Sequence, residues 1–402
     1  MDVLRFLINS LVWGIGLVLK KVKTRNRNKS IILIRPDLIG DFILFTPSLA
    51  YLHNHYSEYK IILLMQDIVS PLIESCPYVD KVVVFNKKKY QRNIFYKFKL
   101  LRELFILKSE KCINTMYSRN RISEEFLLWV GAKENIGLDT KYPGMKINEK
   151  QRSDKNYQIL VKLEDGHPIH ELEINKKFLQ GLGIVVISYV PKLWFIYNEI
   201  GPLNTVLKGR QKKNFIIIGI VPGAYDSYRT WGGAKFQTLM RELCYMHKEI
   251  IFFIFGNKSD QKYLDYLSLK NDEIIDLRGK TSLRELATLL YHCDIVIGNE
   301  TGPLHIANAI GTKSFCILGG GHFGRFYPYP HSFDLKEIPS CFFQFRDCFS
   351  CGWHCIYSLT DNNSYRCIHE VSVEYVIKDV AAYIEDLFLE NKNSKEKHSD
   401  AS

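Results

Sequence analysis

The chain has 402 residues, of which 46% are apolar and 24% charged, a composition typical of a folded protein of about two domains rather than a disordered chain. Its formal net charge of +11 predicts an acidic partner, for which a phosphorylated substrate, an anionic membrane surface and nucleic acid all qualify. Nucleic acid ranks last, because the sequence has no zinc-finger, helix-turn-helix or RNA-binding pattern. The 10 cysteines, several of them isolated in apolar runs, indicate a reducing compartment rather than a disulfide framework.

The N-terminal segment, residues 1–29, joins an apolar run to a basic one. Residues 3–19 are mostly apolar, and lysines and arginines follow between positions 20 and 27. The apolar part is too short and too interrupted for a spanning helix, and the order of charges does not fit a secretory signal. The pattern predicts an interfacial helix with a polybasic stretch that favours an anionic membrane surface. The alternative is a helix that packs on its own protein or on a second subunit.

A first α/β domain is expected over residues 30–200. The apolar run at 31–34 is typical of a buried parallel strand, and runs at 61–64 and 82–85 alternate with helical stretches, which indicates βαβ units. Ligands of such sheets bind outside the carboxyl ends of the strands. The turn after the first strand carries Arg35, Asp37, Gly40 and Asp41, so these residues are candidates for that edge. Asp41 is either a helix cap or a base that faces the ligand.

A second α/β domain is expected over residues 201–370, after a linker at 197–214. Its first strand, at 215–220, leads into P-G-A-Y-D-S-Y-R-T-W from Pro222 to Trp231, where a glycine turn with Arg229 at its far end suits a diphosphate. The alternative is a loop in which Trp231 packs on the core and Arg229 is solvated. Asp260, after a strand at 250–255, either accepts hydrogen bonds from ribose hydroxyls or caps the next helix.

The stretch V-I-G-N-E-T-G-P-L-H-I-A-N-A-I-G at 296–311 indicates a buried strand, a tight turn and a helix start. Free backbone N–H groups at such a start, together with the helix dipole, favour a phosphate, although an ordinary strand-to-helix turn fits the spacing equally well. The residues concerned are Glu300, Thr301, Gly302, Pro303 and His305. Three glycines at 319–321 predict either close approach of a backbone to a ligand or a flexible loop.

Four cysteines lie close together near the C-terminus, namely Cys348, Cys351, Cys355 and Cys367. Their spacing suits a structural Zn²⁺ ion, with reduced, non-ligating thiols as the alternative. A helix with apolar residues at i, i+3 and i+4 is expected in the segment 371–390, packed on the core, and the polar tail at 391–402 is expected to be disordered.

Three of these stretches, in the same order, resemble the ADP-heptose–lipopolysaccharide heptosyltransferases, glycosyltransferase family 9. They are residues 31–49, 222–231 and 277–312, and the likeness runs from Ile31 to about Pro330. The resemblance implies an α/β GT-B architecture, with two Rossmann-like domains facing across a cleft. It also implies that the N-terminal domain binds the acceptor and the C-terminal domain the nucleotide sugar.

The resemblance also implies roles for residues that match the family's motifs. The aspartate after the first strand matches Asp41, the general base, and the basic residue before the tryptophan, usually lysine, matches Arg229, which would neutralise the diphosphate. The phosphate turn matches Thr301, Gly302 and Pro303, and the histidine matches His305. The family needs no metal at the reacting centre. Two departures lie where the donor would bind: Glu300 replaces the usual aspartate, and Ala224 and Tyr225 replace small or hydroxylated residues.

The implied activity is the inverting transfer of a heptose from a nucleotide diphosphate donor, ADP-heptose, to a lipopolysaccharide core or lipid-linked saccharide. The implied location is peripheral, on the cytoplasmic face of the inner membrane. Three alternatives remain open: a relative that uses another nucleotide sugar such as a UDP-hexose, a nucleotide-sugar epimerase or hydrolase, and a non-catalytic glycan-binding relative.

Overall fold

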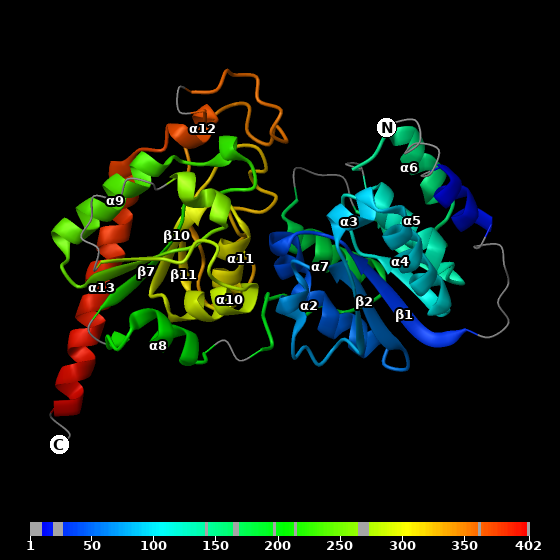
Figure 1. Cartoon of the computed structure of the whole chain (residues 1–402), viewed down its shortest axis with the longest axis horizontal. Helices are drawn as coiled ribbons and strands as arrows, with labels where there is room; N and C mark the ends of the chain where they lie inside the picture. Colours follow the sequence, from blue (N-terminus) through cyan, green and yellow to red (C-terminus); the bar gives the residue numbers. More distant parts are fainter. Residues whose placement is uncertain are drawn as a thin grey trace. The chain divides into compact units, whose positions relative to one another are not determined.

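The structure is a computed structural model that describes residues 10–18, 27–140, 144–163, 169–195, 198–212, 215–263, 273–360 and 363–399, the last ten of these without their side chains. The chain divides into two compact units, Met1–Phe195 and Ile196–Ser402 (Figure 1). The boundary lies close to the one expected at residue 200. Within the described residues, no helix is long and apolar enough to cross a bilayer.

The first unit is a six-stranded parallel sheet in the order β3-β2-β1-β4-β5-β6, which is the order of a doubly wound Rossmann-like fold. Its strands are β1 (Asn28–Arg35), β2 (Lys60–Gln66), β3 (Lys81–Phe85), β4 (Ser109–Asn114), β5 (Glu134–Asp139) and β6 (Ile159–Lys162). Its helices are α2 (Ile39–His55), α3 (Lys87–Arg92), α4 (Ile94–Ile106), α5 (Arg121–Val130), α6 (Ile147–Asp154) and α7 (Glu171–Gly181), with a 3-10 turn η1 (Ser70–Ile73). The central strand β1 is buried along Ile31–Ile34 because helices cover both of its faces, as its continuous apolar run predicts.

The second unit repeats the same topology. Its sheet has the order β12-β11-β10-β7-β8-β9, so β7 and β10 hold the places that β1 and β4 hold in the first unit. Its strands are β7 (Ile216–Val221), β8 (Ile250–Ile254), β9 (Ile274–Asp276), β10 (Ile295–Asn299), β11 (Lys313–Ile317) and β12 (Ser340–Phe342). Its helices are α8 (Gly201–Leu207), α9 (Gly233–Met246), α10 (Leu283–His292), α11 (Gly302–Ala309), α12 (Arg366–His369) and α13 (Val373–Ser399), with 3-10 turns η3 (Ser227–Arg229) and η4 (Lys258–Tyr263).

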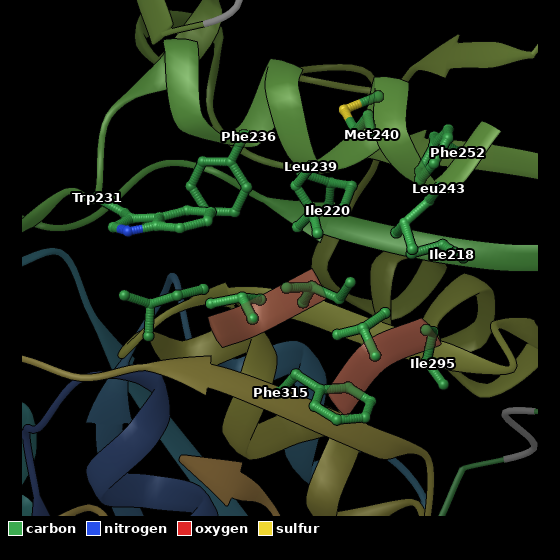
Figure 2. Packing of buried hydrophobic residues seen from close by; sticks show 14 of the residues in the cluster. Ile218, Ile220, Trp231, Phe236, Leu239, Met240, Leu243, Phe252, Ile295 and Phe315 are labelled. Carbon is green, nitrogen blue, oxygen red and sulfur yellow. The ribbon is translucent and has the colours of Figure 1, made fainter. Parts of the chain in front are cut away.

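The core of the second unit lies between its sheet and the helices α9 and α13. Figure 2 shows Phe236, Leu239 and Leu243 of α9 facing Ile218 and Ile220 of β7. The indole of Trp231 lies at the end of this layer and is fully buried, as one of the two interpretations of its loop expected. Burying such large side chains stabilises the fold by roughly 1.5–3 kcal/mol each.

Three boundaries differ from the sequence expectations. Helix α2 begins at Ile39, within the stretch expected to be the turn after the first strand, which places Asp41 inside the first turn of the helix. The expected linker contains the helix α8. Helix α13 packs on the core as predicted, but it continues through Ser399, so the expectation of a disordered tail from 391 onward was wrong for the residues up to 399. Its last turns contain Glu, Lys and Ser but no Gly or Pro, so no residue stops the helix there.

The N-terminal segment lies partly within the described residues, where 10–18 form a helix that packs on the first unit. Val12 is fully buried in the core cluster with Trp129, whose Nε1 donates a hydrogen bond to the Val12 carbonyl at 3.0 Å. This part of the segment therefore follows the alternative of packing on its own protein. Residues 1–9 and 19–26, with most of the basic stretch, lie outside the described residues, and membrane binding by this segment stays a prediction.

Candidate active site

Each unit presents its candidate residues at the same point of its sheet. In a doubly wound sheet, ligands bind where the strand order reverses, beyond the carboxyl ends of the central strands. The order reverses between β1 and β4 in the first unit and between β7 and β10 in the second. Asp41 follows β1, Arg229 follows β7, and Glu300 follows β10. The structure therefore places the candidate acceptor and donor residues at the two expected edges.

Arg35 is the structural centre of the first edge. Its guanidinium is fully buried, makes ion pairs with Asp37 at 2.8 Å and Glu171 at 3.6 Å, and lies 4.7 Å from the centre of the Phe45 ring. It also donates hydrogen bonds to the carbonyls of Thr115 at 2.8 Å and Asp41 at 2.9 Å. An arginine enclosed in this way positions the loop and does not reach an acceptor, which changes the expected role of Arg35 from ligand contact to support.

Asp41 occupies the third position of α2, a place where a carboxylate interacts favourably with the helix dipole. The N-cap residue is Leu38, so Asp41 is not the cap that one interpretation of the turn expected. The residue is half-buried, and its backbone is held by Arg35. Gly40 precedes it in the same turn, and Asp37 is held by the ion pair with Arg35. Asp41 is therefore a carboxylate on a fixed backbone at the ligand-binding edge.

In the second unit, Asn299 joins two of the sequence motifs. This fully buried residue ends β10. Its Nδ2 donates a hydrogen bond to the Pro222 carbonyl at 2.7 Å, and its Oδ1 accepts one from the Trp231 backbone N–H at 2.9 Å. The loop after β7 is therefore tied at both ends to the turn after β10. This junction brings Arg229 and Glu300 to one place.

Arg229 lies between an aromatic ring and a carboxylate. Its guanidinium is 4.2 Å from the centre of the Trp353 ring, and Glu300 is the negatively charged group that acts on it most strongly. Burial lowers the pKa of Arg229, and the negative charge of Glu300 opposes that shift. The Nε atom is enclosed and has no hydrogen-bond partner among the described residues. A bound oxyanion would supply the missing acceptor.

Glu300 is a carboxyl group whose pKa is strongly changed by its surroundings. Burial raises its pKa to about 7, against the opposing charges of Arg229 and Arg325. Its Oε2 atom is enclosed and has no hydrogen-bond partner in the described part of the chain. Near neutral pH the residue therefore exchanges between a neutral acid and a carboxylate, and the local charge next to Arg229 changes with it.

The helix α11 starts directly after Glu300 without a side-chain cap. Thr301 is the N-cap residue, but its hydroxyl donates to the Asn299 carbonyl at 3.1 Å rather than accepting from the helix. Pro303 in the first turn has no N–H to satisfy. The Gly302 amide therefore opens the helix with no side chain bound to it, an arrangement that suits an anion.

Two other candidates are held by protein contacts. The His305 ring is buried among aromatic residues, and its Nδ1 lies 2.6 Å from the Tyr329 hydroxyl, so any contact with a diphosphate stays a prediction. The carboxylate of Asp260 is buried, accepts from the Asn257 N–H at 2.7 Å and packs against Gly223 and Gly256. It lies inside the turn η4 and holds the residue before that turn, so it does not take the N-cap position that one interpretation expected, while its contact with ribose stays a prediction.

The four cysteines line one small cavity together with Trp353 and Tyr365. Burial raises the pKa of the Cys367 thiol, and the other three sulfurs add to that shift, while the Gly320 N–H donates to its Sγ at 3.4 Å. Among the residues that the structure describes, however, no three His, Cys, Asp or Glu side chains have the geometry to hold a metal ion. As placed, the thiols do not form a zinc site, and the bound metal stays a prediction.

The three glycines allow close packing between two parts of the chain. A Cβ atom at Gly320 would lie 2.4 Å from the Phe349 ring, and one at Gly321 would lie 2.1 Å from the Trp353 ring. The loop that carries the cysteines also bonds to this backbone through the N–H groups of Ser350 and Gly352, at 2.7 and 2.8 Å. The glycines therefore let the cysteine loop pack close to the sheet rather than forming a flexible loop, and close approach to a ligand stays a prediction.

Sequence patterns missed three residues at this edge. Trp353, Arg325 and His322 lie around Arg229 and Glu300, and burial with two neighbouring arginines lowers the pKa of His322 to about 4, so it is neutral at pH 7. They come from irregular loops after β11, where no periodicity marks a position. The one sequence signal for the contact between Arg229 and Trp353 is the presence of a tryptophan in the cysteine-bearing loop, since arginine often stacks on tryptophan.

Comparison with known sequences gives a family for this arrangement. Residues 204–335 match the sequence model of glycosyltransferase family 9 (heptosyltransferase). The chain is 24% identical over 323 residues to lipopolysaccharide heptosyltransferase 3 of Escherichia coli, covering 75% of this chain and 88% of that protein. It is 22% identical over 357 residues to lipooligosaccharide heptosyltransferase 2 of Campylobacter jejuni, covering 86% of this chain and 96% of the relative.

Solved structures support the same fold. A family 9 glycosyltransferase from Veillonella parvula superposes with a TM-score of 0.71 at 18% identity, covering 90% of this chain and 99% of the other. The E. coli ADP-heptose lipopolysaccharide heptosyltransferase II superposes with a TM-score of 0.64 at 15% identity, covering 88% and 98%. These are GT-B proteins, and their likeness agrees with the two parallel six-stranded sheets. The chain is thus similar to glycosyltransferase family 9, the heptosyltransferase family, and is a glycosyltransferase.

Proposed function

We propose that the protein transfers a heptose from ADP-heptose to a saccharide of the lipopolysaccharide core, with inversion at the anomeric carbon. The observation that carries the donor side is the group formed by Arg229, Glu300 and the uncapped start of α11 at the switch point of the second sheet. Relatives named as lipopolysaccharide heptosyltransferases support the sugar and the acceptor. A solved E. coli heptosyltransferase with ADP-2-deoxy-2-fluoro heptose, at a TM-score of 0.61, supports the nucleotide.

In the proposed reaction, Asp41 takes the proton from the acceptor hydroxyl as that oxygen attacks the anomeric carbon. The bond between this carbon and the diphosphate oxygen breaks on the opposite face, and ADP leaves. Arg229 and the Gly302 amide offset the charge that develops on the departing diphosphate. Because a cation and a helix start would perform this task, the proposal requires no metal ion or other cofactor for catalysis.

The proposed location is peripheral, on the cytoplasmic face of the inner membrane, where a lipid-linked acceptor would be available. The net charge of +11 supports this location, since anionic lipid surfaces attract basic proteins. Nucleic acid is not among the proposed partners.

The test is donor turnover by the purified protein with and without a truncated lipopolysaccharide acceptor, comparing ADP-heptose with UDP-sugars. Acceptor-dependent release of ADP, lost in Asp41→Asn while donor binding is kept, is the expected result. Turnover of a UDP-hexose instead would change the assigned donor and leave the proposed mechanism unchanged. Release of free or isomerised sugar without an acceptor would refute transfer in favour of a hydrolase or epimerase, and donor binding without any turnover would favour a glycan-binding protein.

A further inference from the structure

A second concentration of positive charge, besides the N-terminal segment, lies on the first unit. The segment from Lys87 to Arg102 contains no aspartate or glutamate. Its basic residues are Lys87, Lys88, Lys89, Arg92, Lys97, Lys99 and Arg102. These seven charges compare with a net charge of +11 for the whole chain, so this one segment of two helices accounts for much of the imbalance.

Six of these seven side chains form no ion pair with any residue that the structure describes. Lys97 is buried and pairs with Glu125 at 2.8 Å, and Tyr90 donates to the same carboxylate at 2.7 Å, which anchors α3 and α4 to α5. The other six residues are exposed, and the described part of the chain gives them no ion-pair partner. The charges are therefore held on a fixed scaffold and directed to solvent.

The position of two of them conflicts with helix electrostatics. Lys87 and Lys88 open the first turn of α3, which contains no acidic residue, whereas Lys89 also belongs to the last turn of this short helix. The positive end of the helix dipole disfavours cations there, by a few tenths of a kcal/mol each. Natural sequences break such local rules chiefly at functional sites.

An exposed apolar stripe accompanies the charges. Phe95 is 84% exposed at the start of α4, and Ile106 is 52% exposed at its end. Lys99 and Arg102 lie four and seven residues after Phe95, so they share one face of the helix with it, and Ile106 follows four residues further. An aromatic ring among lysines and arginines is the composition that interfacial helices present to anionic lipids.

The part of this surface formed by α3 lies on the same edge of the sheet as Asp41. Asn86 caps α3 directly after β3, and its Nδ2 donates to Asp67 at 2.6 Å. Asp67 follows Gln66, the last residue of β2, whose Nε2 donates to the carbonyls of Pro36 at 2.7 Å and Asp37 at 3.0 Å. A chain of hydrogen bonds across the carboxyl ends of β3, β2 and β1 therefore connects the basic helix to the loop before Asp41.

We propose that α3 and α4 form a docking surface for an anionic lipid bilayer, with Phe95 in the headgroup region and the six exposed cations against the lipid phosphates. This surface differs from the N-terminal segment, for which membrane binding was predicted from the sequence. It would place the bilayer next to the edge that holds Asp41. The saccharide end of a lipid-linked acceptor could then reach Asp41 while its lipid stays in the bilayer. The inference adds a binding surface to the proposed function and does not depend on the transfer reaction.

The test is sedimentation of the full-length protein with vesicles of equal parts phosphatidylglycerol and phosphatidylcholine, and with phosphatidylcholine alone. Wild type is expected to bind the anionic vesicles only. Each basic residue near such a surface contributes about fivefold to binding, so replacing Lys87, Lys88 and Lys89 together by glutamine is expected to weaken it on the order of 100-fold. Phe95→Ser is expected to weaken it further.

Matched controls lie on the same unit. Lys60, Lys81 and Lys133 are exposed at the amino ends of β2, β3 and β5, at the opposite edge of the sheet, and replacing these three by glutamine is expected to change binding less than twofold. Ile187→Ser, at another highly exposed apolar side chain, controls for Phe95→Ser. A third triple variant replaces Lys20, Lys21 and Lys23 of the N-terminal segment by glutamine.

Three outcomes would overturn the proposal: equal losses in the two sheet-edge variants, loss of all binding in the N-terminal variant alone, or binding of wild type to a soluble anionic saccharide but not to vesicles. Transfer to a soluble acceptor is measured in parallel. If vesicle binding behaves as expected but no sugar is transferred, the proposed function fails and the docking surface stands.

Discussion

The contact between Arg229 and Trp353 predicts that an aromatic side chain outside the sequence motifs controls diphosphate binding. The guanidinium lies 4.2 Å from the centre of the indole ring, and its Nε atom has no hydrogen-bond partner in the described residues. A planar guanidinium stacks on an aromatic face. Its N–H groups then point outward in the guanidinium plane and stay available to an oxyanion. Trp353 would therefore act as a positioning residue that sets the orientation of Arg229.

The size of this effect follows from the environment of the pair. A cation–π contact contributes about 0.5–1 kcal/mol when exposed and about 2 kcal/mol when desolvated. Arg229 is half-buried, so a contribution of about 1 kcal/mol is expected, which corresponds to about fivefold in a dissociation constant. Trp353→Leu is thus expected to weaken nucleoside diphosphate binding about fivefold, and Trp353→Phe less.

The assay is a double-mutant cycle with Arg229→Ala, using calorimetric titration of ADP and AMP. If Trp353 acts through Arg229, Trp353→Leu has no effect on ADP binding once Arg229 is absent, and its effect on AMP is smaller throughout. Ile356→Ala, at a residue of the same loop that is 76% exposed, is the matched control and is expected to leave binding unchanged. Additive losses in the double variant, within about 0.3–0.5 kcal/mol, would refute the positioning role.

Three further predictions concern the two edges. Asp41→Asn is expected to lower the transfer rate by about 100- to 10,000-fold in steady-state kinetics while the donor dissociation constant is unchanged; an unchanged rate would remove Asp41 as the base. Because burial raises the pKa of Glu300 to about 7, the folded state binds more protons than the unfolded state between the ordinary pKa and 7, so Glu300 destabilises the fold as pH rises through that window. Chemical unfolding at pH 5 and pH 8 is expected to show that Glu300→Gln is more stable than wild type at pH 8, by up to about 3 kcal/mol in the free energy of unfolding and by less if solvent reaches the carboxylate. ADP binding is expected to weaken above pH 7 in wild type only. Asn299→Ala leaves the Pro222 carbonyl and the Trp231 N–H without their partner and is expected to cost about 1–3 kcal/mol in the free energy of unfolding, with a parallel loss of ADP affinity.

The parts of the fold that the sequence predicts well are those with continuous apolar strands. The strands expected at 31–34, 61–64, 82–85, 215–220 and 250–255 are all present, because a strand buried on both faces needs an unbroken apolar run. Strands β4, β5, β6, β9 and β12 were missed. The strands β9 and β12 are three residues long and lie at the edges of their sheet, and β4, β5 and β6 contain no apolar run longer than three residues. Such segments carry no clear periodic signal.

The candidate site was predictable in its motifs but not in the roles of individual side chains. Asp41 and Arg229 stand at the expected edges because chain order and strand ends determine those places. The sequence does not show that Arg35 faces inward. Its burial depends on ion pairs with Asp37 and Glu171 and on a hydrogen bond to the carbonyl of Thr115, which follows β4. The basic run at 87–102 is plain in the sequence, but its exposure and its place on the Asp41 edge required the structure.

The glycine triplet has a consequence for variation in this protein. A methyl group at any of the three positions would come within 3 Å of Ile368, Phe349 or Trp353, none of which is a flexible polar chain that can turn away. Saturation mutagenesis of residues 319–321 should therefore recover glycine almost exclusively under selection for activity. Because Trp353 rests on Gly321, even an alanine that leaves the protein folded should weaken diphosphate binding, and it would do so without altering any residue that touches the donor.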